Sequence, residues 1–297
     1  MLKNFFLYLS RQRALRRWME TSPSARVLSR RFIAGNRLED GLAVVRELRA
    51  RGIYTALDPL GENVSTEAEA RAAAGNAMAA LRGASGEAAG AVLSIKLTQF
   101  GLDFSQELTL ENVLPLVRVA GEAGSRVEVD MESTAYTERT LAMLETMAGA
   151  GPVRGVIQAY LYRTAGDIER LNGLRVPVRL CKGAYNEPAD LAMQRKADVD
   201  ENYKRMSTLL LEKGTYPAFA THDPAMIEHV LALRPAKDQL EFQMLYGIRR
   251  DLQERLLGEG WRVRLYVPYG EAWYPYFMRR LAERPANVWF VAKGLLR

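Results

Sequence analysis

Polar and charged residues recur where short apolar segments of the chain end. In chain order they are Asp58, Lys96, Asp130, Gln158, Arg179 with Lys182, Thr221 with His222 and Asp223, Gln243, and Tyr266. A charged group at the end of a buried strand must be paired or hydrogen-bonded. One or two such residues would be structural ion pairs, but a series along eight segments favours one polar, ligand-binding edge.

The segment from Arg179 to Pro188 combines positive charge with small residues. Arg179 and Lys182 flank the end of an apolar run, and Gly183 and Ala184 follow directly. Small residues let a planar or phosphorylated ligand approach the backbone, and the two cations would attract it. From the residues alone, an anion site and an ordinary loop explain this segment equally well.

A second group of polar residues lies near the end of the chain, in a stretch with helical spacing. Tyr276, Arg279, Arg280 and Glu283 stand at i, i+3, i+4 and i+7 and therefore share one helix face. Adjacent arginines can bind a carboxylate or a phosphate, with Glu283 orienting them. On spacing alone, a solvated face with an Arg279–Glu283 pair is the simpler interpretation.

Alternating apolar segments and helical stretches would position these side chains. The expected strands are 53–57, 92–97, 127–131, 155–159, 177–181, 217–220, 240–244 and 263–267. Their nearly continuous apolar character suits strands covered on both faces. The expected helices are 66–82, 107–122, 136–147, 165–171, 189–211, 225–233, 248–257 and 271–282. Eight such units indicate an α/β fold, a (β/α)8 barrel, with a doubly wound open sheet as the alternative.

The positive charge is concentrated at the N-terminus. Residues 1–31 contain eight basic residues and one acidic residue, a net +7, whereas the whole chain carries +6. The rest of the chain is close to neutral, so its cations are expected to be matched locally, and a nucleic-acid partner is disfavoured. We divide the chain into an N-terminal basic helical arm with capping helices, residues 1–50, and a catalytic barrel, residues 51–297. A solvated capping helix, a transit peptide and an interfacial amphipathic helix are the interpretations of the arm.

Few cysteines and histidines restrict the chemistry. Cys181 is the single cysteine, so no intrachain disulfide forms, and inside a strand it is expected to be a small core residue. With two histidines, no metal site is expected, and no run of 18 apolar residues would span a membrane. The dinucleotide-binding, P-loop and hydrolase motifs are missing, so the mouth of the barrel must hold any cofactor.

Five sequence elements, in the same order along the chain, resemble the proline dehydrogenase family. They are Ser-Ile-Lys96-Leu, Val-Asp130-Met131-Glu, Arg179-Leu-Cys-Lys-Gly-Ala-Tyr185, Ala220-Thr221-His222-Asp223, and Tyr266-Val-Pro-Tyr-Gly followed by the Tyr276–Glu283 group. The resemblance covers residues 35–297. It implies a distorted (β/α)8 barrel with FAD at its mouth, oxidation of L-proline to 1-pyrroline-5-carboxylate by hydride transfer to the flavin, and reoxidation by a quinone, the first step of proline catabolism to glutamate.

The resemblance also implies roles for individual residues. Asp130 and Arg179 would be catalytic, with Arg179 near the reactive flavin nitrogen. The substrate-binding residues would be Lys96, Tyr185, Leu245, Tyr266, Tyr276, Arg279, Arg280 and Glu283. The cofactor-binding residues would be Met131, Gln158, Arg179, Lys182, Gly183, Ala184, Thr221 and His222. On this basis the Tyr276–Glu283 group becomes functional rather than a solvated face.

The same resemblance implies partners. Since the chain has no room for a second dehydrogenase domain, we expect a monofunctional enzyme whose product passes to a separate pyrroline-5-carboxylate dehydrogenase. A quinone acceptor lies in the membrane, so we expect a cytoplasmic protein whose basic arm contacts the inner face of the membrane. Two other hypotheses stay open: a Schiff-base lyase that uses Lys96 or Lys182, and a non-catalytic anion-binding barrel.

Overall fold

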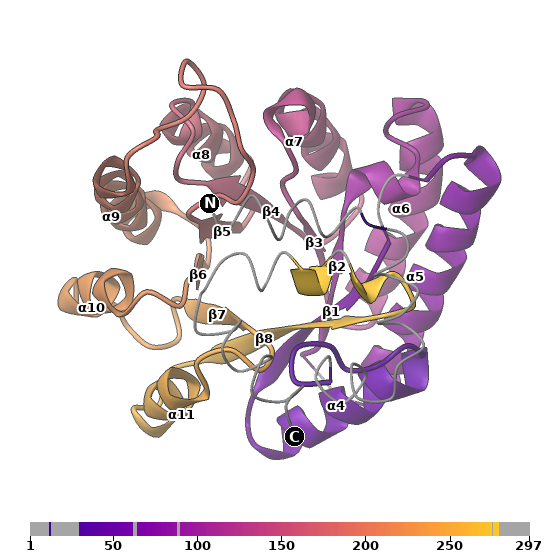
Figure 1. The fold of residues 1–297 in the computed structure, drawn as a ribbon, viewed down its shortest axis with the longest axis horizontal. Coiled ribbons are helices and arrows are strands. Elements are labelled where there is room, and N and C mark those ends of the chain that lie inside the picture. The colour runs from indigo at the N-terminus through magenta and orange to yellow at the C-terminus, as the bar shows by residue number, and fades with distance from the viewer. Residues whose placement is uncertain (1–11, 13–29, 62–63, 88–89, 275, 279–297) are drawn as a thin grey trace.

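Eight parallel strands form a closed barrel in the computed structural model of the chain, which describes residues 12, 30–61, 64–87, 90–274 and 276–278. The strands are β1 (Tyr54–Pro59), β2 (Val92–Ile95), β3 (Val127–Val129), β4 (Val153–Gln158), β5 (Val178–Cys181), β6 (Ala218–Ala220), β7 (Glu241–Leu245) and β8 (Val263–Tyr269). They lie in chain order around the barrel, and β8 pairs with β1 to close it (Figure 1). The predicted barrel is confirmed, and the open-sheet alternative is wrong.

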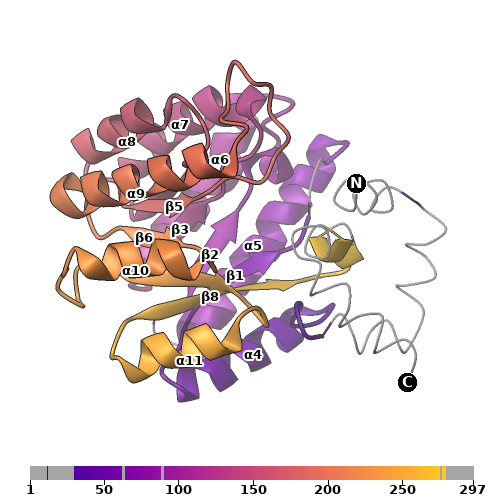
Figure 2. The ribbon, with the colours of Figure 1, turned by 60° about the vertical axis from the view of Figure 1, so that its left-hand side comes forward.

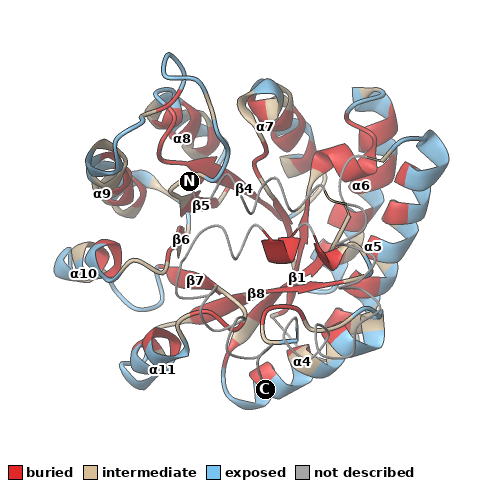
Figure 3. Ribbon diagram, viewed as in Figure 1, coloured by how far each residue is buried: buried red, intermediate tan, exposed pale blue. Residues whose placement is uncertain are grey.

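Helices surround the barrel on all sides (Figures 1 and 2). They are α4 (Leu38–Ala50), α5 (Glu67–Glu87), the 3-10 helix η1 (Leu97–Phe100), α6 (Gln106–Glu122), α7 (Thr134–Ala148), α8 (Thr164–Gly173), α9 (Lys196–Lys213), α10 (Pro224–Ala232) and α11 (Arg250–Gly258). Their inward faces are buried and their outward faces are exposed (Figure 3). Ser105 and Asp223 begin α6 and α10 as N-caps, because their side chains accept backbone N–H groups of the first turn.

The helix expected over 189–211 begins only at Lys196, so its first part is wrong. Residues 189–195 form a loop that bonds the loop after β4. The N–H of Met193 donates to the carbonyl of Tyr160 (2.8 Å), and the N–H of Tyr162 donates to the carbonyl of Leu191 (3.1 Å). Because the neighbouring loop satisfies these backbone groups, the segment does not need helical bonds despite its helical spacing.

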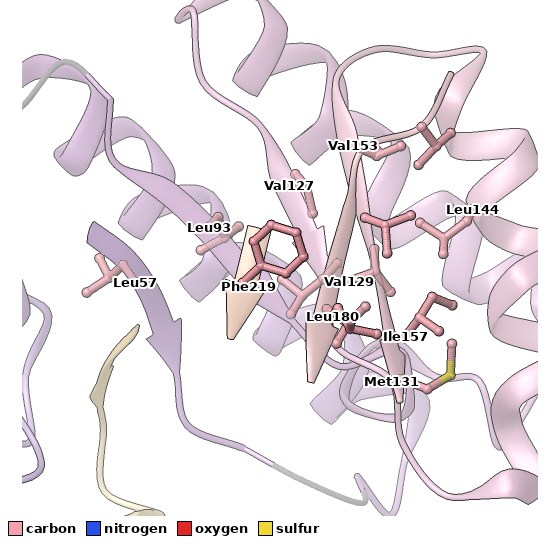
Figure 4. Close-up of a cluster of buried hydrophobic side chains, with 14 of the residues drawn as sticks. Leu57, Leu93, Val127, Val129, Met131, Leu144, Val153, Ile157, Leu180 and Phe219 are labelled. Carbon is pink, nitrogen blue, oxygen red and sulfur yellow. The ribbon is translucent and has the colours of Figure 1, made fainter. Parts of the chain in front are cut away.

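The strands alternate between apolar residues that face the helices and polar residues that face the barrel interior. Val127, Val129, Ile157 and Leu180 belong to one buried hydrophobic cluster with helix residues such as Leu144 (Figure 4). Each fully buried aliphatic side chain of this kind contributes about 1.5–3 kcal/mol. The expectation that the strands are covered on both faces is confirmed, since nearly all strand residues are buried, but several of the side chains that face the interior are charged.

A network of buried charges fills the interior of the barrel, and we call Glu128, Arg154, Glu241, Gln243 and Arg264 the interior network. Arg154 donates to Glu128 (2.8 Å) and to Glu241, and Arg264 donates twice to Glu241 (2.9 and 3.0 Å). Gln243 donates to Glu241 (2.8 Å) and to Glu128. Burial alone would raise the pKa values of Glu128 and Glu241, but the neighbouring guanidinium groups outweigh burial and hold both below their usual range.

The ring of helices around the strands differs from that of a regular (β/α)8 barrel at the junction of β8 and β1. Helix α4, which precedes β1, packs against β1, β8 and α5 and occupies the place between α11 and α5 (Figure 1). The helical residues after β8, 273–274 and 276–278, instead pack with Leu245, the last residue of β7, and with Tyr266 in the middle of β8. This is the distortion that the resemblance implied. Residues 279–282 of the expected last helix lie outside the described residues, and the domain boundary at residue 50 stays a prediction.

Within the described residues, no helix combines the length and the apolar character that crossing a bilayer requires.

Replacing an arginine of the interior network should destabilise the fold more than replacing an arginine on the surface. Arg154 is fully buried between two glutamates, so Arg154→Met leaves Glu128 and Glu241 undercompensated and should lower the free energy of unfolding by about 3–5 kcal/mol. The control is Arg71→Met, which removes an exposed ion pair with Glu111 (3.2 Å) and should lower it by about 0–1 kcal/mol. Urea unfolding followed by circular dichroism measures the free energies of unfolding of both variants. Equal urea midpoints of the two variants would contradict the structural role of the interior network.

Candidate active site

Asp130 lies directly after β3, at the carboxyl end of the barrel, where four donors converge on its carboxylate. Its Oδ1 accepts from the hydroxyl of Ser94 (3.0 Å) and from Arg179. Its Oδ2 accepts from Nζ of Lys96 (3.2 Å) and from the hydroxyl of Tyr266 (2.7 Å). These donors lie in β2, β5 and β8 or directly after β2, so closure of the barrel brings together residues as far apart as Lys96 and Tyr266, which are 170 positions apart and hydrogen-bonded (3.3 Å). We call these five residues the Asp130 cluster.

The charges of the Asp130 cluster fix its protonation state. Burial alone would raise the pKa of Asp130, but the positive charges of Arg179 and Lys96 and the hydrogen bond from Tyr266 lower it to about 2. Burial, together with the negative charge of Asp130, raises the pKa of Tyr266 well above its usual value. At neutral pH the site therefore holds an ionised carboxylate and a neutral phenol that donates to it.

Each cation of the site is shared between two acids. Nζ of Lys96 lies 3.7 Å from Oδ1 of Asp58 and 3.2 Å from Oδ2 of Asp130. Arg179 binds Asp130 on one side and Glu128 (3.1 Å) on the other. Because Lys96 side-chain atoms are 15% exposed and those of Asp58 only 2%, the ammonium group is the more accessible partner of that pair.

Arg179 joins the Asp130 cluster to the interior network. Its Nη1 donates to Glu128 and to the side-chain carbonyl of Gln243 (3.2 Å). Gln243 was expected at the site from the sequence, whereas the four charged residues of the interior network were not: Glu128, Arg154, Glu241 and Arg264. Two of these residues could have been predicted, because each is a charged residue two positions before a predicted site residue, and positions i and i+2 of a strand face the same side. Glu128 precedes Asp130 in this way, and Arg264 precedes Tyr266.

Lys182, a predicted cofactor residue, lies after β5 in a cluster of two lysines and two aspartates. Its Nζ donates to Asp223 (2.7 Å) and to Asp200. Lys196, at the start of α9, pairs with the same two carboxylates. Thr221 stands beside this cluster, because its hydroxyl accepts the backbone N–H of Asp223 (3.1 Å). The positive charge of Lys182 is thus already balanced by neighbouring acids.

Gln158 and His222 are held by bonds to neighbouring strand ends. Gln158 is buried at the end of β4 and donates to the carbonyl of Glu132 (3.0 Å). Nε2 of His222 accepts the backbone N–H of Leu245 (2.9 Å). In this geometry Nε2 carries no proton, so the neutral ring carries its proton on Nδ1. The bond also fixes Leu245, a predicted substrate residue.

The turn after β5 requires a glycine. Gly183 has φ +117, and an added Cβ would lie 2.3 Å from the ring of Tyr160. Ala184 and Tyr185 follow and are exposed. Met131, by contrast, is 7% exposed and belongs to the hydrophobic cluster between strands and helices (Figure 4). The roles predicted for these residues stay predictions.

Three predicted substrate residues share one hydrophobic cluster at the mouth. Tyr276 is 6% exposed and belongs to a cluster that Leu245 and Tyr266 also contact. Trp273 and Phe277 stiffen it with an edge-to-face contact at 5.8 Å. The remaining predicted substrate residues of this segment, which lie outside the described residues, are Arg279, Arg280 and Glu283.

The described residues of the site favour electrostatic rather than thiol chemistry. Burial raises the pKa of Cys181 to about 11, so it is not a thiolate at neutral pH. No group of three or more metal-ligating side chains occurs in the part of the chain that the structure covers. What remains is a balanced set of cations and anions at the barrel mouth, suited to binding and orienting a small charged substrate.

Comparisons with known proteins agree on one family. The model of the proline dehydrogenase family matches residues 42–293. Proline dehydrogenase 1 of Bacillus subtilis subsp. natto is 40% identical over 302 residues, which cover 100% of both chains. Proline dehydrogenase of Deinococcus radiodurans is 41% identical over 280 residues, which cover 91% of this chain and 90% of that one. The monofunctional form predicted from the sequence fits these full-length matches.

Larger proteins contain a similar barrel. Proline utilization A (PutA) from Bdellovibrio bacteriovorus, solved after inactivation by N-propargylglycine, superposes with a TM-score of 0.79 and 26% identity, over 87% of this chain and 33% of that one. The bifunctional protein PutA of Salmonella typhimurium is 30% identical over 90% of this chain and 24% of its own length. Since the family model spans most of the chain and full-length relatives are about 40% identical, this chain belongs to the proline dehydrogenase family.

Proposed function

We propose that this protein oxidises L-proline to 1-pyrroline-5-carboxylate with FAD as the hydride acceptor, and that the electrons pass to a quinone. Family membership supports proline dehydrogenase activity, the first step of proline catabolism. The observation that carries the finer proposal is the Asp130 cluster. An ionised aspartate there holds Lys96 and Arg179 beside a neutral Tyr266 at the mouth of the barrel.

Cations at the mouth would bind the carboxylate of proline. Lys96 is the accessible cation among the described residues of the Asp130 cluster, since Arg179 is only 6% exposed in its side chain. We propose that Arg279 and Arg280 complete the carboxylate site and that Glu283 orients them. The proline ring would lie against Leu245, Tyr266 and Tyr276, which share one cluster, with Tyr185 covering it.

The same charges would favour the reactive form of the substrate. A hydride can leave the ring carbon of proline only when the adjacent nitrogen is neutral and can donate its lone pair. Nearby cations lower the pKa of a bound amine. Asp130 would attract a protonated amine, but both its oxygens already accept hydrogen bonds from four donors. The site therefore favours a neutral amine beside a bound carboxylate.

The residues at the strand ends fit FAD by the hydrogen-bonding groups they offer. An amide ends β4, a cation follows β5, and a hydroxyl and an imidazole follow β6 (Gln158, Lys182, Thr221 and His222). Bound FAD would supply the acceptor for the hydride. The residues proposed to hold it are Met131, Gln158, Arg179, Lys182, Gly183, Ala184, Thr221 and His222.

The two alternative functions are weaker. A Schiff-base lyase would need Lys96 or Lys182 as a nucleophile, yet each contacts two carboxylates, so forming a Schiff base would break those ion pairs. A non-catalytic anion-binding barrel does not explain why the chain matches a family of oxidoreductases along most of its length.

We also propose where the protein works. A cytoplasmic protein whose basic arm, residues 1–31, contacts anionic lipid at the inner face of the membrane would lie close to a membrane quinone. Its product would pass to a separate pyrroline-5-carboxylate dehydrogenase.

FAD dependence predicts a visible change on adding substrate. The purified protein should carry bound FAD and show the absorption bands of oxidised flavin. Anaerobic L-proline should bleach these bands, because bound FAD would accept the hydride. Absorption spectroscopy before and after proline measures this, with D-proline as the control. A protein that stays colourless after incubation with FAD would overturn the flavin proposal.

Replacing the central anion should alter kinetics in a defined direction. Asp130→Asn removes the charge that holds Lys96 and Arg179, so kcat/KM for proline should fall by about tenfold or more. The variant also leaves more positive charge near the bound amine, so the acid limb of kcat should move to lower pH. Between pH 5 and 9, neither Asp130, with a pKa of about 2, nor Tyr266 titrates in the unmodified enzyme.

Steady-state kinetics across that pH range checks both effects. The exposed Asp238→Asn is the control and should leave kcat, KM and the pH profile unchanged. An acid limb that moves to higher pH in Asp130→Asn would contradict the role assigned to the cations.

The arm predicts charge-dependent lipid binding. Replacing Arg11, Arg13, Arg16 and Arg17 with glutamine lowers the arm from +7 to +3, so sedimentation with phosphatidylglycerol vesicles should be largely lost. Neutral phosphatidylcholine vesicles are the control, and activity with a soluble electron acceptor should not change. Undiminished binding of the variant to anionic vesicles would remove the arm from the proposal.

A further inference from the structure

A cavity lies at the opposite end of the barrel from the Asp130 cluster. Its volume is about 510 Å³, within the range of ligand pockets, and it opens among the loops that enter the strands. The lining includes Tyr54 and Val92 from the starts of β1 and β2, Val153 from the start of β4, and the loop residues 124–126 and 174–177. It is therefore separate from the site at the carboxyl ends of the strands.

Four arginines line this cavity, and no acidic residue does: Arg126, Arg175, Arg262 and Arg264. Arg264 is neutralised by Glu241 (2.9 Å) in the interior network. The other three have no ion pair with any carboxylate that the structure describes. The expectation that the cations of the barrel are matched locally is therefore wrong here, and three guanidinium groups surround one space.

Aromatic rings hold two of these guanidinium groups in place without neutralising them. Arg262 lies over the rings of Tyr54 (5.1 Å) and Tyr216 (5.4 Å) and also donates to the Tyr216 hydroxyl. The guanidinium carbon of Arg126 lies 5.5 Å from the centroid of the Tyr216 ring. Burial and the nearby charge of Arg154 lower the pKa of Arg126. Both cations are thus oriented, and the repulsion between Arg126 and Arg154 is one that a bound anion would relieve.

The third guanidinium belongs to a residue in an unfavourable backbone conformation. Arg175 follows the end of α8 with φ 56, the left-handed region in which glycine is the least strained residue. Arg234 stands at the same position after α10, with φ 52, but does not line the cavity. The two residues therefore share charge, φ and position after a helix, but only Arg175 lines the cavity.

We propose that this cavity binds a small phosphorylated molecule through Arg126, Arg175 and Arg262. Guanidinium groups present several donors in a planar fork that matches the oxygens of a doubly charged oxyanion. The cavity is larger than one inorganic anion, so a phosphate ester fits better than free phosphate. The inference is independent of the proposed oxidation of proline, because it involves no residue of the Asp130 cluster.

Calorimetric titration of the full-length protein, saturated with FAD, tests the proposal. The probes are inorganic phosphate and glycerol 3-phosphate, with sodium chloride at equal ionic strength as the control titrant. We expect both phosphates to bind and chloride to give no saturable heat. Tighter binding of the ester than of phosphate supports an organic ligand, and a saturable signal from chloride alone would overturn the site.

Two glycine variants locate the binding. Arg175→Gly and Arg234→Gly both remove one positive charge and relieve one left-handed residue, so neither should unfold at a lower temperature than the parent. Only Arg175→Gly should weaken phosphate binding, by about tenfold for one lost charge-assisted contact. Equal affinities of the two variants would overturn the proposal, since phosphate would then bind elsewhere.

A substitution on the opposite wall is an independent check. Arg126→Gln removes a crowded charge that has no ion pair among the described residues, so the phosphate-free variant should keep its unfolding temperature. Its stabilisation by added phosphate should fall well below that of the parent protein. If added phosphate raised the unfolding temperatures of Arg126→Gln and Arg175→Gly as much as that of the parent protein, phosphate would not bind in this cavity, and the proposal would be wrong.

Discussion

Ion pairs run without interruption through the barrel, from the strand starts to the carboxyl ends. Their order is Arg264, Glu241, Arg154, Glu128, Arg179 and Asp130. Buried charges of this kind have lost their hydration, so each is stable only while its partner stays in place. The barrel interior therefore tolerates little rearrangement, and the position of every charge depends on its neighbours.

This constraint links fold stability to the proposed chemistry at Glu128. One oxygen of Glu128 accepts from Arg154, and the other accepts from Arg179. Arg179 therefore reaches Asp130 from an anchored position, and Asp130 in turn holds Lys96. A group that is held before substrate arrives loses little freedom on binding, which is the condition for electrostatic preorganisation. The geometry of the mouth therefore depends on charges deeper in the barrel.

The sequence predicts the eight-strand barrel and four members of the Asp130 cluster, but not Ser94, because the strand pattern is local and the motifs keep a fixed order along the chain. It does not predict the interior network, because Glu128 pairs with residues of β4, β5 and β7 that only barrel closure brings together. The helix predicted over residues 189–195 is wrong for a related reason. Their helical spacing is local, whereas their bonds to Tyr160 and Tyr162 come from another loop.

Net charge conceals how differently the two ends of the barrel are arranged. At the mouth, Lys96 and Arg179 are matched by Asp58, Asp130 and Glu128, so a substrate meets oriented dipoles rather than a large excess charge. At the other end, Arg126, Arg175 and Arg262 face a cavity without acids in its lining. A barrel whose net charge is close to zero can therefore produce a strong local electrostatic field. At a few ångströms, that field depends on where the individual charges lie and not on their sum. Neutral composition argues against a broad nucleic-acid surface, but it does not argue against a small, concentrated anion site.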